Sequence, residues 1–545
     1  MEYTISANIV DVINRKIFPG EILVKGKNII KITHRKKEFN HFLVPGLIDA
    51  HVHIESSMLV PSEFARLAVR HGTVATISDP HEIANVLGIE GIKFMYHNGR
   101  RVTFKFYFGA PSCVPATDFE TSGSRIDLQE IKELFLNYKF KYLAEVMNFP
   151  GVINEDKTII AKIKLARKLN KMIDGHAPGL TGINLVKYIS KGITTDHETE
   201  SIAEGREKLK SGMKIIIREG SAAKNFNELI PLLNEFQESI MLCTDDLHPD
   251  DLYDGHIDRI IKMGIDSGYD FFSLLQAATL NPSMHYKLNA GLLREKDPAD
   301  FVLINNPENF KVLETYIDGQ KVYDNGRIRI KHIKEENINN FNCDKIESSL
   351  LKVKAKSKRI NIIEAFDGQL YTRKITAAAK IKNDEVISDI NKDILKIVVY
   401  NRYKKSIPAV SFIKGFGLKR GAIASTIAHD SHNIICIGAD DIDIVNAINR
   451  LIELKGGILL TENGNYEEIQ LSIGGLLTFK NGKQVAEDYR NLNKRVKSMG
   501  SQLNAPFMTM SFMALLVIPE LKLSDKGLFD VQNFGLIDLF DKESN

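Results

Sequence analysis

The stretch that decides the fold is Pro45-Gly46-Leu47-Ile48-Asp49-Ala50-His51-Val52-His53, an apolar run that ends in two histidines separated by one residue. Because residues i and i+2 of a strand point to the same face, both imidazoles can aim at one point. The pair therefore predicts a metal clamp at the carboxyl end of a strand. A lone His-x-His pair is also compatible with two polar residues that simply leave a strand, so the assignment depends on the rest of the chain.

Short apolar runs alternate with amphipathic helical stretches from residue 44 to about residue 287. This alternation is typical of βα units and a parallel sheet. Helices are predicted between the strands, for example over 156–170, 185–190 and 229–236. Strands are predicted near 44–50, 73–78, 103–108, 141–146, 171–174, 193–196, 213–217 and 240–244. The pattern matches a (β/α)8 TIM-like barrel, in which the chemistry lies at the carboxyl ends of the strands.

The predicted fold class is α/β, and the chain outside the barrel (44–287) divides into three parts. Residues 1–43 and 288–332 contain short apolar runs separated by turn residues, which predicts a small β-sandwich formed by the two flanking segments. Residues 333–358 are rich in charge and asparagine and predict a linker. Residues 359–545 mix strand-like and helical patterns, which predicts an additional C-terminal α/β domain.

The composition is that of an ordinary globular protein, with 26% charged and 43% hydrophobic residues. The net charge of +3 is too balanced to indicate a nucleic-acid surface. The N-terminus lacks a signal-peptide pattern, and no uncharged apolar stretch reaches the ~20 residues that a membrane span needs. Four scattered cysteines without a CxxC pair argue against a zinc ribbon or a disulfide framework. We expect a cytoplasmic protein without nucleic-acid or membrane partners.

Further metal-ligand side chains lie at or just past the ends of four later predicted strands. With the first pair they make a set of four imidazoles and two carboxylates: His51, His53, Glu145, His176, His197 and Asp245. These donors suit Zn, Fe or Mn, and the lack of cysteine ligands argues against a closed structural zinc. Six donors match two ions about 3.5–4 Å apart, with a bridging carboxylate, better than one open catalytic ion. A single member such as His176 is more often a core or loop histidine, so the prediction rests on the set.

On its motifs the chain resembles the amidohydrolase superfamily, and most closely the adenine deaminases. The first matching stretch is 45–57, but its motif Pro-Gly-x-Ile-Asp-x-His-x-His, residues 45–53, marks only the superfamily, over about 1–330. The stretch Asp79-Pro80-His81-Glu82-Ile83-Ala84-Asn85 and the C-terminal region narrow the resemblance to the deaminases, over nearly the whole chain. Asp174-Gly175-His176-Ala177-Pro178 and Cys243-Thr244-Asp245-Asp246 match as well. Many relatives bridge their metals with a carbamylated lysine on strand four, where this chain has Glu145.

The resemblance implies hydrolytic deamination of adenine to hypoxanthine and ammonia by a metal-activated hydroxide, with two divalent ions (Mn or Fe, with Zn compatible). Asp245 would accept the proton of the water and pass it toward the amine. Glu198 and Glu82 would handle the ring nitrogens, although each fits a solvated loop carboxylate as well. Asp246 and His81 would contact the purine. The implied partner is a small purine base, and a homodimer is one candidate for the oligomeric state.

Two alternatives remain open at this point. Another amidohydrolase reaction, such as cyclic amide hydrolysis, would use the same donors, and a metal-binding scaffold is the alternative from a different class. The cytidine-type zinc deaminases are a poor model, because their Pro-Cys-x-x-Cys motif is absent.

The loop 218–224 is predicted either to shape the pocket or only to turn into the next helix. The segment Ala428-His429-Asp430-Ser431-His432-Asn433 is predicted as a loop between strands, in preference to a second metal site or a catalytic dyad. The C-terminal domain that contains it is expected to pack on the barrel, where it covers the site or supports oligomers.

Overall fold

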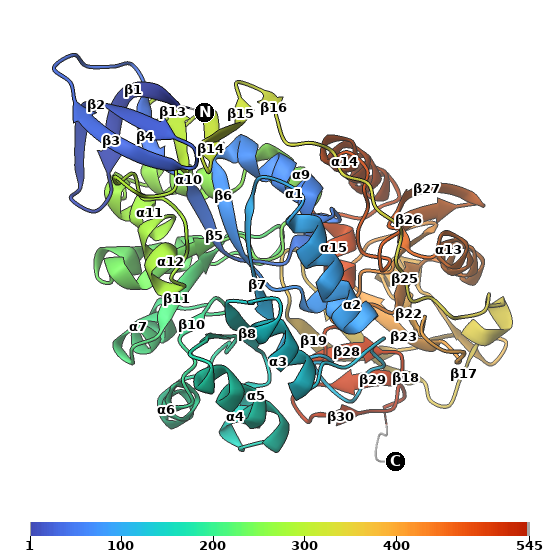
Figure 1. The fold of residues 1–545 in the computed structure, drawn as a ribbon. Coiled ribbons are helices and arrows are strands. Elements are labelled where there is room, and N and C mark those ends of the chain that lie inside the picture. The colour runs from blue at the N-terminus through green and yellow to red at the C-terminus, as the bar shows by residue number, and fades with distance from the viewer. Residues whose placement is uncertain (1, 542–545) are drawn as a thin grey trace.

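Two distant segments of the chain form one sheet at the edge of the molecule, which we call the flanking sheet (Figure 1). The computed structural model describes residues 2–541. The strands of the flanking sheet follow the order β16-β15-β14-β13-β4-β1-β2-β3, with the bounds β1 (Glu2–Asp11), β2 (Lys16–Lys25), β3 (Asn28–His34), β4 (Phe42–Pro45), β13 (Phe301–Ile304), β14 (Val312–Ile317), β15 (Gln320–Asp324) and β16 (Arg327–Ile328). Because β4 pairs with both β1 and β13, the two segments share one continuous sheet. This sheet folds back on itself, since Tyr3 of β1 lies against Tyr316 of β14 with ring centroids 6.2 Å apart, which is compatible with the predicted sandwich of flanking segments.

Eight parallel strands follow the flanking sheet along the chain: β5 (Leu47–Val52), β6 (Thr73–Ser78), β7 (Lys105–Ala110), β8 (Tyr142–Val146), β9 (Met172–Gly175), β10 (Thr195–Asp196), β11 (Lys214–Arg218) and β12 (Ile240–Cys243). Strands β5 to β9 make one parallel sheet and β10 to β12 another. Backbone hydrogen bonds connect the two sheets on both sides, from the Thr194 amide to Ile173 O (3.0 Å) and from the Asp245 amide to His51 O (2.9 Å). The strands therefore form a curled parallel sheet whose carboxyl ends lie on one side.

The strands alternate between two buried surfaces, as the two-residue period of a strand requires. In β11, Ile215 and Ile217 belong to the large core shared with the helices, whereas Ile216 belongs to a separate cluster with Ala50 and Met241 from other strands. The helices that follow the strands are α1 (Pro61–Ala68), α2 (His81–Gly99), α3 (Leu128–Leu136), α4 (Phe149–Ile153), α5 (Lys157–Lys168), α6 (Gly182–Ser190), α7 (Ile202–Lys210), α8 (Phe226–Leu229), α9 (Pro249–Asp254), α10 (Ile257–Asp266), α11 (Phe271–Ala277) and α12 (Leu280–His285).

Two predicted elements have different bounds in the structure. The predicted strand 44–50 is divided between β4 and β5 at Gly46, where a Cβ atom would lie 2.4 Å from the Val74 side chain. The predicted helix 229–236 is instead the short α8 followed by a 3-10 segment, Ile230–Asn234. Pro231 has no amide hydrogen to continue an α-helix, so the regular helix ends before it.

A second eight-stranded sheet forms the centre of the C-terminal region, in the order β19-β18-β23-β22-β25-β24-β26-β27. Strand β22 is buried at all six positions, as its apolar sequence predicts. The bounds are β18 (Arg359–Ala365), β19 (Thr372–Ala378), β22 (Leu395–Tyr400), β23 (Ala409–Lys414), β24 (Ala422–Ser425), β25 (Ile434–Gly438), β26 (Gly457–Glu462) and β27 (Asn465–Gln470). The region also contains the helices α13 (Asp441–Leu454), α14 (Gly482–Ser498) and α15 (Pro506–Ser511). One small sheet is formed by β17 (Val353–Lys354), β21 (Glu385–Ile387) and β20 (Lys380–Lys382). Another is formed by β28 (Leu521–Ser524), β29 (Gly527–Asp530) and β30 (Gly535–Leu536).

The predicted linker, 333–358, has two different halves. Its first half has no regular helix or strand. In its second half, Ile346 and Leu351 are buried in a cluster with residues of α13. Val353–Lys354 forms β17, which pairs with β21 of the C-terminal region. The second half of this polar segment therefore packs as part of the C-terminal region, because a few apolar residues within it reach that core.

The C-terminal region contacts the parallel strands where their carboxyl ends lie. The Thr478 amide donates to Met58 O (2.9 Å), six residues beyond the end of β5. Within residues 2–541, no helix has both the length and the apolar character that crossing a membrane requires. The contact between the two regions encloses the pocket described next.

Candidate active site

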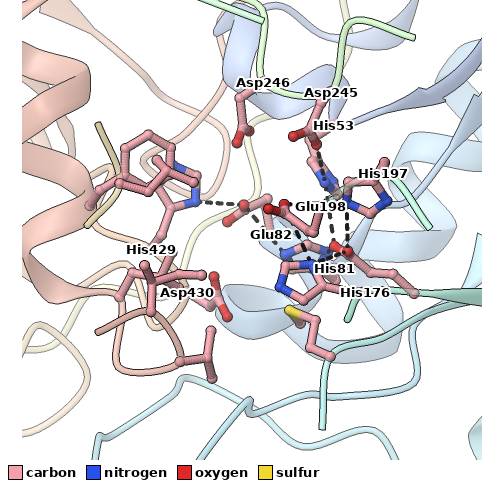
Figure 2. A pocket seen from close by; sticks show the side chains of 17 residues that line it. His53, His81, Glu82, His176, His197, Glu198, Asp245, Asp246, His429 and Asp430 are labelled. Carbon is pink, nitrogen blue, oxygen red and sulfur yellow. Dashed lines mark hydrogen bonds and ion pairs between the residues drawn. The ribbon is translucent and has the colours of Figure 1, made fainter. Parts of the chain in front are cut away.

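The ends of five parallel strands bring the six predicted donors to one place, which we call the donor cluster. Figure 2 labels four of these donors, His53, His176, His197 and Asp245, at one side of a pocket. All six side chains are buried, and they follow the strand ends as the βα pattern predicts: His51 in β5, His53 after β5, Glu145 in β8, His176 after β9, His197 after β10 and Asp245 after β12. Because parallel strands place their carboxyl ends at one side of the sheet, residues separated by almost 200 positions meet there.

Glu145 lies between two groups of imidazoles. Its Oε1 lies 3.4 Å from Nε2 of His53, and its Oε2 lies 2.8 Å from Nδ1 of His176 and 3.2 Å from Nε2 of His197. Burial would raise the pKa of the Glu145 carboxyl, but the two neighbouring histidines, His176 and His197, hold that pKa well below its usual range. An ionised carboxylate with one oxygen toward each group has the arrangement that a bridging ligand needs.

Asp245 completes the first group of donors. Its Oδ1 lies 3.2 Å from Nε2 of His53 and 3.4 Å from Nε2 of His51, and these two nitrogens lie 3.2 Å from each other. Nδ1 of His53 faces the carbonyl oxygen of Asp79 at 3.1 Å, so a neutral ring donates there and keeps a lone pair on Nε2. Lone pairs of two imidazoles and a carboxylate that converge in a buried space fit a divalent cation.

A second test of the fit comes from buried ring nitrogens without partners. Within the described part of the chain, Nδ1 of His51 and Nε2 of His176 are buried and make no hydrogen bond. Buried polar atoms rarely stay unpaired in folded proteins, and an ion is one of the ordinary explanations. Side chains in this cluster therefore have the chemistry and the positions to hold metal.

His81 and Asp79, from the end of β6, lie beside Glu145. Nδ1 of His81 lies 3.3 Å from Oδ2 of Asp79 and 3.5 Å from Oε1 of Glu145, and its Nε2 lies 3.4 Å from Oε1 of Glu82. The sequence predicts His81 as a substrate contact, and the structure places it between the donor cluster and Glu82. Asp79 is not identified as a site residue from the sequence, although it directly follows the end of β6, as several of the predicted donors follow their strands.

Arg218, the last residue of β11, connects two of the predicted catalytic carboxylates. Its guanidinium donates to both oxygens of Glu198 (2.5 and 3.0 Å) and to Oδ2 of Asp245 (2.6 Å). Burial would raise the pKa of Asp245, but the charge of Arg218 is the largest of the influences that hold it well below its usual range. The sequence places Arg218 only at the start of a pocket loop. A charged residue at the end of an apolar strand was the signal that could have identified it.

The C-terminal region supplies two histidines to Glu82. Oε1 of Glu82 lies 2.7 Å from Nδ1 of His429, and its Oε2 makes a close contact with Nε2 of His432. The Ala428 amide donates to Nδ1 of His432, so the proton of a neutral His432 ring is on Nε2 and is donated to Glu82. That tautomer favours a hydrogen bond over a further metal site, although Glu82, His429 and His432 are close enough together to hold an ion.

The pocket has a polar side from the parallel strands and an apolar side from the C-terminal region. Asp246 lines it, and Oγ of Ser56 donates to Oδ1 of Asp246 at 2.5 Å. The apolar lining comes mainly from C-terminal side chains: Leu370, Phe512, Leu515, Val517 and Ile518. A flat apolar molecule with polar edges would find both kinds of surface here.

Comparison with known proteins gives matches along nearly the whole chain. The model of the Amidohydrolase family matches residues 42–322, and that of the Adenine deaminase C-terminal domain matches residues 369–535. An adenine deaminase of Methanosarcina acetivorans is 50% identical, over 98% of this chain and 99% of its own. Those of Borreliella afzelii (48% identical; 98% and 99% covered) and Salinibacter ruber (46% identical; 99% and 99% covered) are similar over the same extent.

Proposed function

Because the chain belongs to the adenine deaminases of the amidohydrolase family, we propose that it hydrolyses adenine to hypoxanthine and ammonia. The observation that carries the proposal is the buried donor cluster, in which Glu145 contacts imidazoles on both sides. Cyclic amide hydrolysis is less well supported, because the curated relatives of near-full length are named adenine deaminases. We further propose that the eight parallel strands form a complete (β/α)8 barrel around this site.

We propose that the donor cluster holds two divalent ions, manganese or iron, with zinc also compatible. His51, His53 and Asp245 would hold one ion, His176 and His197 the other, and Glu145 would bridge them. When bound, the metal pair would lower the pKa of water and so supply a nucleophile at neutral pH.

The carboxylates around the cluster have separate tasks in this proposal. Asp245 would accept the proton of the attacking water and pass it to the departing amine. Arg218 lowers the pKa of Glu198 against the effect of burial, which makes Glu198 an acceptor suited to the N–H bonds of the amino group. Glu82 is held by His429, whose pKa is raised to about 9 against the effect of burial by that same carboxylate. Glu82 with His429 is therefore the better candidate for delivering a proton to a ring nitrogen.

The direct test of the proposed function is ammonia release by purified protein. Protein stripped of metal and supplied with Mn, Fe or Zn should release ammonia from adenine, and the chelated protein should not. Adenosine, cytosine and a hydantoin serve as competing substrates in the same assay. Hydantoin opening without ammonia release from adenine would reject the deaminase proposal in favour of cyclic amide hydrolysis.

Arg218→Gln is expected to make the enzyme less active in acid. Without the guanidinium, Glu198 and Asp245 are two buried carboxylates without their cation, so their pKa values rise. The proposed mechanism needs both carboxylates in their ionised form. The acidic limb of the kcat/KM profile should therefore move to higher pH by about one unit or more. A profile from pH 5 to 9, with metal content measured alongside, checks this. An unmoved limb in a metal-replete variant would show that Arg218 does not control these carboxylates.

A further inference from the structure

We infer that Asp430 of the C-terminal region accepts a hydrogen bond from the N–H of the five-membered ring of the substrate, and so selects the free base over its nucleoside. The inference rests on the proposed function and adds a specificity-determining residue to it. Asp430 lies in the loop between β24 and β25, five residues beyond the end of β24.

Asp430 is a buried carboxylate that lines the pocket without a partner. Asp430 is only 3% exposed, and its Oδ2 atom is buried. Within residues 2–541, no hydrogen bond or ion pair to this carboxylate is found, whereas Glu82 has two histidines and Asp246 has Ser56. An unpaired buried carboxylate is costly, so its place in a binding pocket points to a ligand that donates to it.

The position of Asp430 in the pocket indicates which part of the substrate it meets. Figure 2 shows Asp430 on the opposite side of the pocket from His53 and His197. The carbon that is attacked and its amino group must lie at the donor cluster, so the five-membered ring extends toward the other side. Phe512, which stacks on His429 with ring centroids 4.7 Å apart, adds an apolar face to the pocket.

The chemistry of a carboxylate then determines the contact. An ionised carboxylate only accepts hydrogen bonds, and adenine has one N–H away from its amino group, on the five-membered ring. Burial raises the pKa of Asp430 to about 6, against the lowering by His81, so the group is still ionised at pH 7.5. A nucleoside carries a sugar at this nitrogen and would leave the carboxylate unpaired, which is the arrangement that gives strong discrimination.

Asp430→Ala and Asp430→Asn test the inference in the metal-loaded enzyme. The alanine variant should raise the KM for adenine by about 10- to 100-fold with a much smaller change in kcat, while the asparagine variant, which keeps an acceptor oxygen, should lie between it and the wild type. Discrimination between adenine and 9-methyladenine, as the ratio of kcat/KM values, should fall by a similar factor in the alanine variant. Metal content and the melting temperature are measured on each protein.

Asp443→Ala is the matched control, because Asp443 is also a buried aspartate with an unpartnered oxygen but does not line the pocket. It should leave KM and the discrimination ratio unchanged. A KM within twofold of wild type in Asp430→Ala, or equal losses on adenine and 9-methyladenine, would overturn the inference. If Asp430→Ala does not fold, the wild type decides: equal kcat/KM for adenine and 9-methyladenine rejects the contact. A wild type inactive on adenine rejects the proposed function instead, and the inference with it.

Discussion

Asp245→Asn is expected to retain its metal and to lose turnover by about 10²- to 10⁴-fold, the range that a general base contributes. Asparagine has the same shape and keeps one oxygen for the histidines, which lie 3.2 and 3.4 Å from Oδ1 in the structure. It cannot accept a proton from water at neutral pH. The loss should appear in kcat, because the pocket surface that contacts the base is not changed. Steady-state kinetics with adenine and metal analysis of the same sample measure both parts of the expectation.

Asp258→Asn is a suitable control for this substitution. Asp258 is also a carboxylate paired with an imidazole, Nδ1 of His71 at 3.0 Å, but it lies outside the donor cluster. Its variant should keep normal turnover even if the melting temperature falls. Near-normal activity of a metal-replete Asp245→Asn would falsify the role of Asp245 as the base.

Glu145→Gln is expected to have the largest effect of all, because it removes the charge between the two groups of imidazoles. The amide would still fill the space, but it cannot serve as an ionised bridge, and the two ions would repel each other without it. We expect metal content to fall from two equivalents to one or fewer, and activity to fall to the level of metal-free protein. Metal analysis after equilibrium dialysis against Mn or Fe checks the stoichiometry directly.

The control for Glu145→Gln is Glu204→Gln. Glu204 is a buried glutamate that is not one of the six donors, and its Oε1 accepts a hydrogen bond from Lys208 at 2.5 Å. Its loss should reduce stability, since it leaves a buried ammonium with fewer partners, without changing the metal content. Two bound equivalents and normal turnover in Glu145→Gln would mean that another group bridges the ions.

Much of the candidate site is predictable from the sequence, because its residues follow a local rule. His51 and His53 lie at the end of β5 with their Nε2 atoms 3.2 Å apart, and Glu145, His176 and Asp245 each lie at a strand end. Parallel strands bring such ends together whatever the loops between them do. The same local rule predicts the alternation of strands and helices, but it does not specify that Gly46 separates β4 from β5, which depends on contact with Val74.

The parts that sequence reasoning missed depend on contacts between distant elements. Glu82 meets His429 and His432 across about 350 positions of the chain, and nothing in the local pattern of either segment predicts that contact. The unpaired state of Asp430 becomes visible only when every neighbouring donor is known. Arg218 is an intermediate case, since its strand-end position is local but its pairing with two carboxylates is not.

The most direct test of the central claim is anomalous X-ray diffraction from crystals of the protein loaded with manganese. The account predicts two anomalous peaks about 3.5–4 Å apart, with the Glu145 carboxylate between them. His51 and His53 should lie at one peak, and His176 and His197 at the other. A single peak, or peaks with no contact to Glu145, would contradict the two-ion site from which the proposed chemistry is derived.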